Sequence, residues 1–307
     1  MSDRMDARRR RLLAAMTVTA ATAVCAPLAA AAPPLTRRVP ATGEALPLVG
    51  LGSWITFNVG NDRQARRECA EVVAAFFAAG GRMIDSSPMY GSSQDVIGSA
   101  LAGLGMPSAL FSADKVWTAP GSRGPAQIAQ SLTAWRVARF DLLQVHNLLA
   151  WHEHLPALYA MKAAGRIRYV GITTSEGRRH AEIEQIMARE PIDFVQVTYN
   201  VLDREIEQRI LPLARERRIG VIANRPFREG ALLRQLSRHP LPAWAAEIGC
   251  TTWAQAVLKF IVAHPDVTCA IPATTSVAHV RENLAAAALP LPDAALRRRI
   301  AADVGKL

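Results

Sequence analysis

The sequence is poor in aromatic residues, which make up 6% of its 307 residues, and it holds only four cysteines. It contains no P-loop, no Gly-x-Gly-x-x-Gly dinucleotide fingerprint and no Gly-x-Ser-x-Gly nucleophile elbow. These absences count against nucleotide hydrolases, doubly wound dehydrogenases and serine hydrolases. Half of the residues are hydrophobic, so the chain can bury a sizeable core, which excludes disorder, collagen and coiled coil.

Cysteine and histidine spacing gives no sign of a disulfide framework or a metal site. The cysteines include no Cys-x-x-Cys pair and stand at positions 25, 69, 250 and 269. Because Cys25 lies in a predicted leader, an odd number remains, and we expect no disulfide framework. His152 and His154 begin a predicted helix, where two residues at this spacing point to different faces. We therefore expect no metal.

The first 31 residues have the pattern of an export signal. Consecutive arginines followed by Leu12 and Leu13 precede an alanine-rich apolar stretch over residues 12–32, and Ala31 offers a cleavage point. Paired arginines in this setting are typical of a twin-arginine signal. An uncleaved membrane anchor and a misassigned start codon are the alternatives. We expect a signal peptide at 1–31, a domain at 32–307, periplasmic localisation, and no stable membrane anchor after cleavage.

The positive charge of the chain is dispersed. The formal net charge is +10, and the leader carries five Arg and two Asp, so +7 remains after cleavage. Beyond the leader, no run of like charges exceeds the three arginines 297–299, and no basic strip contains interleaved aromatics. Nucleic-acid binding is therefore disfavoured, whereas a phosphorylated cofactor is compatible with this charge.

Short apolar runs alternate with helical stretches eight times. The expected strands cover residues 48–53, 82–86, 110–117, 141–146, 169–174, 194–199, 221–224 and 268–272. The expected helices cover residues 63–79, 94–104, 125–139, 152–164, 177–189, 205–217, 230–238 with 252–264, and 277–287. Continuous apolar strands suit a sheet that is buried on both faces. Eight such units predict an α/β protein with a single (β/α)8 TIM barrel; a doubly wound sheet is the competing fold.

Polar residues lie at the predicted carboxyl ends of consecutive strands, where a barrel carries its chemistry. They are Asp85, Tyr90, Lys115 and His146. Each has a structural explanation when taken alone: a helix cap, a loop aromatic, a lysine at a strand end, a core histidine. Together they form a general acid: a lysine ammonium lowers a tyrosine pKa, a carboxylate holds the lysine, and a neutral histidine contacts a carbonyl oxygen.

The order and spacing of these four residues resemble the catalytic tetrad of the aldo-keto reductase family. The resemblance extends to Gly50-Leu51-Gly52-Ser53-Trp54, to Gln196 with Arg204 behind it, and to the segment from Ile271-Pro272 to Glu282-Asn283. It covers essentially all of residues 48–287. It implies that Tyr90 is the general acid, that Lys115 and Asp85 tune it, and that His146 orients the carbonyl.

The resemblance also implies where a nicotinamide cofactor binds. The implied cofactor-binding residues are Gly52, Ser53, Trp54, Thr173, Thr174, Gln196, Asn224, Arg225, Pro226, Thr274, His279, Glu282 and Asn283. Thr173 and Gln196 are expected to hold the carboxamide. Arg225 could cover the nicotinamide ring or contact a phosphate, and Arg228 is a second candidate for the phosphate. Asn224 stands where the family often has an aromatic. The expected cofactor is NADP, with NAD as the alternative.

The predicted function is NAD(P)H-dependent reduction of a small aldehyde or ketone, or the reverse alcohol oxidation, by an enzyme expected to be a monomer. Two alternatives remain open from the residues alone. One is a cofactor-binding or regulatory protein of the same fold without redox turnover. The other is a non-redox lyase that uses Tyr90 and Lys115 as an acid/base pair.

Overall fold

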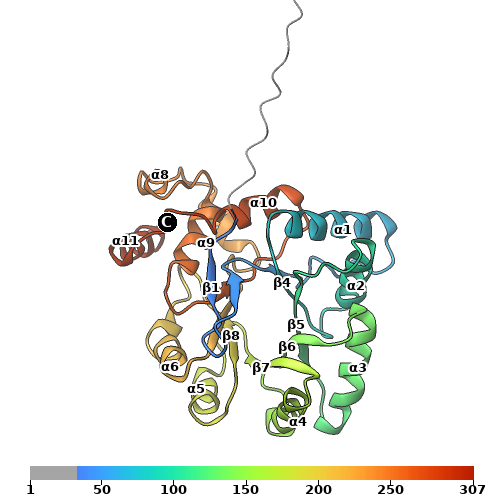
Figure 1. The fold of residues 1–307 in the computed structure, drawn as a ribbon. Helices are drawn as coiled ribbons and strands as arrows, with labels where there is room; N and C mark the ends of the chain where they lie inside the picture. Colours follow the sequence, from blue (N-terminus) through green and yellow to red (C-terminus); the bar gives the residue numbers. More distant parts are fainter. Residues whose placement is uncertain (1–32) are drawn as a thin grey trace, which may run out of the picture. The chain divides into compact units, whose positions relative to one another are not determined.

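Eight parallel strands form the closed barrel predicted from the apolar runs (Figure 1). The strands are β3 (Leu51–Gly52), β4 (Met83–Asp85), β5 (Phe111–Val116), β6 (Phe140–His146), β7 (Ile167–Thr173), β8 (Phe194–Thr198), β9 (Gly220–Asn224) and β10 (Cys269–Ala270). Each pairs with the next in chain order. Parallel bridges from Val49 to Ala270 and from Gly52 to Ala273 join the first strand to the last. The doubly wound alternative is therefore wrong.

This computed structural model describes residues 33–307, so the predicted signal peptide at 1–31 lies outside the described residues. Residues 33–307 belong to one compact unit. No helix within the described part of the chain is long and apolar enough to cross a membrane.

Helices surround the barrel, and α1 to α6 follow one another around its outside in chain order (Figure 1). The helices are α1 (Arg63–Ala78), α2 (Ser93–Gly103), α3 (Gly124–Trp135), α4 (Trp151–Ala163), α5 (His180–Arg189), α6 (Ile210–Arg217), α7 (Ala231–Leu236), α9 (Trp253–Val262) and α10 (Val277–Ala285). Side-chain caps fix several starts: the carboxylate of Asp62 accepts from the amide nitrogens of Gln64 and Ala65 at the start of α1.

Several elements were not predicted. They are the strands β1 (Thr36–Arg38) and β2 (Ala45–Pro47), the helices α8 (Trp244–Glu247) and α11 (Ala294–Val304), and the 3-10 turns η1 (Gly121–Arg123) and η2 (Glu205–Glu207). The three-residue strands are too short to show a periodic pattern. The long helix expected at 205–217 is divided, because η2 precedes α6.

The hairpin of β1 and β2 closes the amino-terminal end of the barrel. Val39 and Leu46 are fully buried in the apolar cluster that fills the barrel interior. Glu44, in the hairpin turn, pairs with Arg168 and accepts a hydrogen bond from the Tyr169 hydroxyl at 2.8 Å. The chemistry is therefore confined to the opposite, carboxyl-terminal end.

Inward-facing side chains change from apolar to polar along each strand. In β6, Leu142 belongs to the interior cluster, whereas Gln144 and His146 are buried polar residues farther along the same face. Gly171 of β7 leaves room for this layer, because a Cβ there would lie 3.0 Å from Cγ of Gln144 and 2.9 Å from the Phe194 carbonyl oxygen. The strands thus place a polar floor above an apolar base.

Candidate active site

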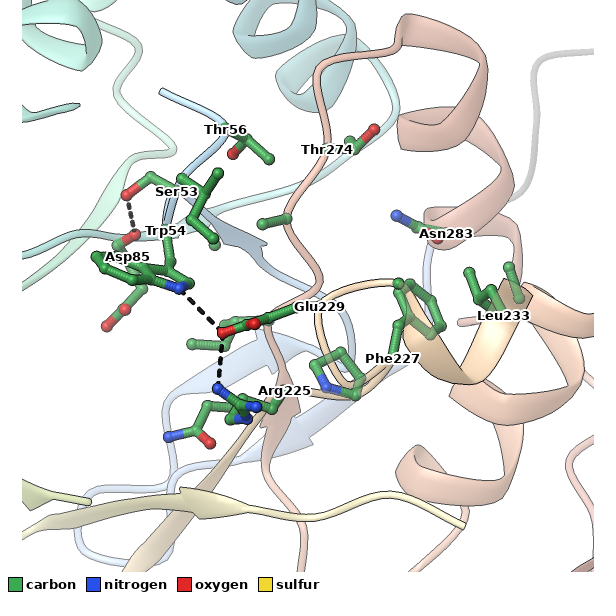
Figure 2. Close-up of a pocket in the computed structure, with 18 of the residues that line it drawn as sticks. Ser53, Trp54, Thr56, Asp85, Arg225, Phe227, Glu229, Leu233, Thr274 and Asn283 are labelled. Atoms are coloured by element: carbon green, nitrogen blue, oxygen red, sulfur yellow. Dashed lines mark hydrogen bonds and ion pairs between the residues drawn. The ribbon is translucent and has the colours of Figure 1, made fainter. Parts of the chain in front are cut away.

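A cavity of about 800 Å³ opens at the carboxyl-terminal end of the barrel. Its lining comes from the ends of the strands and the loops after them, together with residues of α10 (Figure 2). Asp85, Tyr90 and His146 all reach this lining. The fourth predicted residue, Lys115, lies beneath the cavity floor with 1% of its surface exposed.

Lys115 is held by an acidic and a backbone partner. Its Nζ lies 2.5 Å from Oδ1 of Asp85 and donates to the Ser86 carbonyl oxygen at 2.8 Å. Burial alone would lower the pKa of Lys115, but attraction to Asp85 and the other acidic groups outweighs burial, and the pKa is raised. The ammonium therefore stays charged.

Tyr90 lies directly above this ion pair. The Lys115 Nζ is 5.1 Å from the centroid of the Tyr90 ring. Burial raises the pKa of Tyr90, and the Lys115 ammonium, which lowers it, offsets only part of that effect. The expectation of a lowered pKa was therefore wrong in sign for the net shift. The consequence is a phenol that keeps its proton at neutral pH.

His146 faces Tyr90 with the two rings almost perpendicular, their centroids 5.7 Å apart. Burial, followed by repulsion from Lys115, lowers the pKa of His146 to about 2. Its Nδ1 is hydrogen-bonded to Oγ of Ser87 at 2.7 Å, which fixes the ring. A neutral imidazole next to a phenol can contact a substrate oxygen without adding positive charge.

Two glutamines hold the other oxygen of Asp85. Gln196 Nε2 donates to Oδ2 of Asp85 at 2.9 Å, and Gln144 Nε2 donates to the same atom at 3.3 Å. Gln196 Oε1 accepts from Thr173 Oγ1 at 3.3 Å, so both ends of this amide already have protein partners. Sequence reasoning missed Gln144, although it lies two residues before His146 on the same strand face.

The predicted cofactor-binding residues lie along the cavity, with one exception. All of them except Thr174 belong to the lining, from Gly52, Ser53 and Trp54 at one side to Thr274, His279, Glu282 and Asn283 at the other. Thr174 is buried, and its main-chain carbonyl oxygen accepts a hydrogen bond from the side-chain Nδ2 of Asn224 at 2.9 Å. Thr174 thus supports Asn224 from behind the cavity wall.

Arg225 bridges two loops at the cavity mouth. Its Nη1 lies 2.7 Å from Oε1 of Glu229 and 3.1 Å from Oε1 of Glu176. Figure 2 shows Glu229 between this guanidinium and the Trp54 indole, whose Nε1 donates to Oε1 at 3.2 Å. Arg228, the other predicted phosphate contact, is instead bound to Asp203 outside the lining. The Glu229 contact had no signal in the sequence.

The residues at the start of α10 are ordered by a cap. Ser276 Oγ accepts from the His279 amide nitrogen, and Thr274 Oγ1 lies 3.3 Å from Nδ1 of His279. Glu282 and Asn283 reach the cavity from the next turn. This edge therefore presents a hydroxyl, an imidazole, a carboxylate and an amide to a ligand.

Metal ligands are not grouped in the described part of the chain. Across residues 33–307, no cluster of three or more His, Cys, Asp or Glu side chains could hold a metal ion. His154 is buried, and its Nε2 lies 2.9 Å from the Thr118 carbonyl oxygen, which gives it a structural role. Cys69, Cys250 and Cys269 are free and buried.

Comparison with known proteins agrees with this geometry. The profile of the aldo/keto reductase family matches residues 48–301. Methylglyoxal reductase YeaE of Escherichia coli strain K12 is 28% identical over 256 residues, which cover 82% of this chain and 89% of the relative. An NADH-specific methylglyoxal reductase of the same strain is 25% identical over 315 residues, covering 82% of this chain and 93% of the relative.

Solved structures show the same likeness. The crystal structure of an aldo-keto reductase from Klebsiella pneumoniae in complex with NADPH has a TM-score of 0.72 and 25% identity, covering 87% of this chain and 94% of that one. The family profile spans most of the described chain, including the cavity and the residues on its floor. The chain belongs to the aldo/keto reductase family.

Proposed function

We propose that this chain, an NAD(P)-dependent oxidoreductase by its family, reduces a small aldehyde or ketone with Tyr90 as the proton donor. The observation that carries the proposal is the group of Asp85, Lys115, Tyr90 and His146 at the floor of one large cavity. The proposed cofactor is NADP, with NAD as the alternative.

The cavity suits a dinucleotide. Its volume of about 800 Å³ lies within the range of cofactor sites. Its lining offers hydroxyls and side-chain amides along its length, among them Thr173, Gln196, Thr274 and Asn283. Thr173 and Gln196 would hold the nicotinamide end, whereas Thr274 and Asn283 would meet the adenosine end. A reduced nicotinamide, when bound, supplies a hydride that no amino acid can provide.

The chain's own residues supply the proton. Because the pKa of Tyr90 is raised, its hydroxyl is protonated at neutral pH and can donate to the oxygen of a bound carbonyl. The Lys115 ammonium, kept charged by Asp85, then stabilises the phenolate that remains. Neutral His146 donates a hydrogen bond that orients the same carbonyl oxygen.

We propose a small dicarbonyl compound as the substrate. Two relatives are named methylglyoxal reductases, which supports this class. Two apolar side chains lie near Tyr90 in the lining: Trp54, whose ring centroid is 4.9 Å from that of Tyr90, and Met89. The arginines of the lining, Arg178 and Arg225, are both paired with Glu176, so the site favours an uncharged substrate.

We further propose that the protein is exported to the periplasm as a monomer. The support is the twin-arginine pattern in residues 1–31, which lies outside the described residues. The absence of a basic patch in the sequence supports a small-molecule role rather than nucleic-acid binding.

The proposal is tested with the purified chain, by titrating NADPH and NADH and by measuring reduction of methylglyoxal. Tyr90→Phe should lower turnover by about 10²- to 10⁴-fold, the range for loss of a general acid, and leave cofactor affinity unchanged. Tyr159→Phe is the matched control, because Tyr159 lies on α4 and its hydroxyl bonds to Glu190.

Each outcome has a distinct meaning. Turnover by the wild-type and its loss in Tyr90→Phe alone supports carbonyl reduction. Cofactor binding without turnover would favour a cofactor-binding protein, and failure to bind either cofactor would favour non-redox chemistry on the same barrel. Equal activity of Tyr90→Phe and wild-type would contradict the role given to Tyr90.

A further inference from the structure

Asp114, the residue before Lys115, is a buried carboxylate that the proposed reaction does not use directly. Its exposed surface is 0%. Because neighbouring residues of a strand point to opposite faces, Asp114 faces the helices while Lys115 faces the cavity. Oδ2 of Asp114 accepts from Gln94 Nε2 of α2 at 2.7 Å, and Gln94 also donates to Ser131 Oγ of α3 at 2.9 Å.

The other oxygen of Asp114, Oδ1, accepts a main-chain hydrogen bond in place of one that is missing between β4 and β5. β4 pairs with β5 as far as Asp85 opposite Ala113, and the Ser86 amide nitrogen then donates to the Ala113 carbonyl oxygen. In a regular parallel ladder, the next bond would run from the Lys115 amide to the Ser86 carbonyl oxygen. Here the Lys115 side chain binds that oxygen at 2.8 Å, and the Lys115 amide donates to Oδ1 of Asp114 at 2.7 Å.

The same contacts connect β5 to the segment that carries Tyr90. Gln94 lies in the first turn of α2, four residues after Tyr90. Ser93, at the start of that helix, is hydrogen-bonded through Oγ to Oγ of Ser86 at 2.9 Å. The backbone positions of Tyr90 and Lys115 therefore depend on one buried network.

The charge state of Asp114 is set by a small number of groups. The charged groups that act on it are Lys115 on its own strand and Asp85 on β4. Asp95 of α2 is paired with Arg66, α3 carries no charged residue, and Asp141 of β6 is paired with Arg168. Burial raises the pKa of Asp114 to about 7, although its hydrogen bonds to the Lys115 amide and Gln94 act in the opposite direction.

We propose that Asp114 is a positioning residue for the proposed reduction: its ionised carboxylate holds the Lys115 main chain and α2 so that Lys115 and Tyr90 keep their arrangement. This inference rests on the proposed function. Protonation of Asp114 removes its charge and turns one carboxyl oxygen into a hydroxyl, so the hydrogen bonds that it accepts from Gln94 and from the Lys115 amide become weaker. Turnover should therefore rise as Asp114 ionises.

The test is the pH profile of kcat for methylglyoxal reduction at saturating NADPH, in Asp114→Asn, Gln94→Leu and Asp95→Asn. Asp95→Asn is the matched control, because this exposed aspartate lies on the same helix. The ionised form should turn over about tenfold faster than the protonated form, the value of one charge-assisted hydrogen bond. With a pKa of about 7, kcat of the wild-type should therefore rise by about fivefold between about pH 6 and about pH 8. Asp114→Asn should stay at the lower rate throughout, with unchanged cofactor affinity.

Gln94→Leu provides a readout, the pH at which the step in kcat occurs, that a merely structural role would not change. It removes a donor to the ionised carboxylate, so the pH step should move upward. A step that persists in Asp114→Asn would belong to a group other than Asp114. A wild-type profile in Asp114→Asn would overturn the proposal.

A second measurement does not depend on turnover. Amide hydrogen exchange at Lys115 should accelerate in Asp114→Ala, which removes the acceptor, and remain slow in Asp95→Asn. If the wild-type reduces no carbonyl, the proposed function fails, and the exchange comparison decides the role of Asp114 alone. Unchanged protection of the Lys115 amide in Asp114→Ala would refute that role. If the alanine variant does not fold, the exchange of the Lys115 amide is compared between wild-type and Asp114→Asn at about pH 6 and pH 8 instead.

Discussion

Replacing Asp114 with asparagine should make the free energy of unfolding less sensitive to a rise in pH. The carboxyl is fully buried, and burial raises its pKa from 3.8 to about 7. Because the folded-state pKa is the higher one, stability at this residue is fully present below about pH 4 and is lost as the pH rises to about 7. A difference of about three pKa units corresponds to about 4 kcal/mol. About 2 to 3 kcal/mol of it should be lost between pH 5 and pH 8.

The assay is urea unfolding of wild-type and Asp114→Asn at pH 5 and pH 8, with Asp95→Asn as the control. The free energy of unfolding of Asp114→Asn, relative to wild-type, should increase by about 2 to 3 kcal/mol between the two pH values. The exposed Asp95 should give no comparable change. A constant difference between Asp114→Asn and wild-type would show that Asp114 has the same charge at both pH values, and would refute this reasoning.

Three further predictions concern the cavity. Burial lowers the pKa of His146 to about 2, so His146→Gln should lower turnover by the same factor at pH 5 and pH 8; a factor that varies with pH would contradict this. Glu229→Gln removes one carboxylate from Arg225 and should tighten NADPH binding by up to about fivefold in a fluorescence titration; weaker binding would count against a phosphate contact. Gln144→Leu removes a hydrogen bond to Asp85 and should lower kcat by about tenfold without changing cofactor affinity; an unchanged kcat would make Gln144 a packing residue.

The barrel was predictable because its strands, even the two-residue β3 and β10, lie within longer buried apolar runs of the sequence. β6 and β7 have seven residues each, and their buried faces leave a clear pattern. β1 and β2 have three residues each and include Arg37, Arg38 and Pro47, so nothing in their composition indicates a strand. Their hairpin forms because Val39 and Leu46 find an apolar interior, which only the closed barrel creates.

In the candidate site, too, some features were predictable from the sequence and others were not. Asp85, Lys115 and His146 could be grouped from sequence because each follows a predicted strand, and parallel strands end at one edge. The direction of the Tyr90 pKa could not, because it depends on how much burial opposes Lys115. The contact of Glu229 with Trp54 joins residues 175 positions apart, and a loop conformation determines it.

Because the hairpin of β1 and β2 closes the amino-terminal end, the barrel holds a pocket rather than a channel that runs through it. Val39 and Leu46 fill its base, and Glu44 is fastened there to Arg168 and Tyr169. In the described part of the chain, a molecule that reaches Tyr90 therefore enters and leaves through one mouth. When two ligands are bound, the deeper one can leave only after the ligand nearer the mouth has left. The order of release is therefore set by how deep each ligand lies in the cavity.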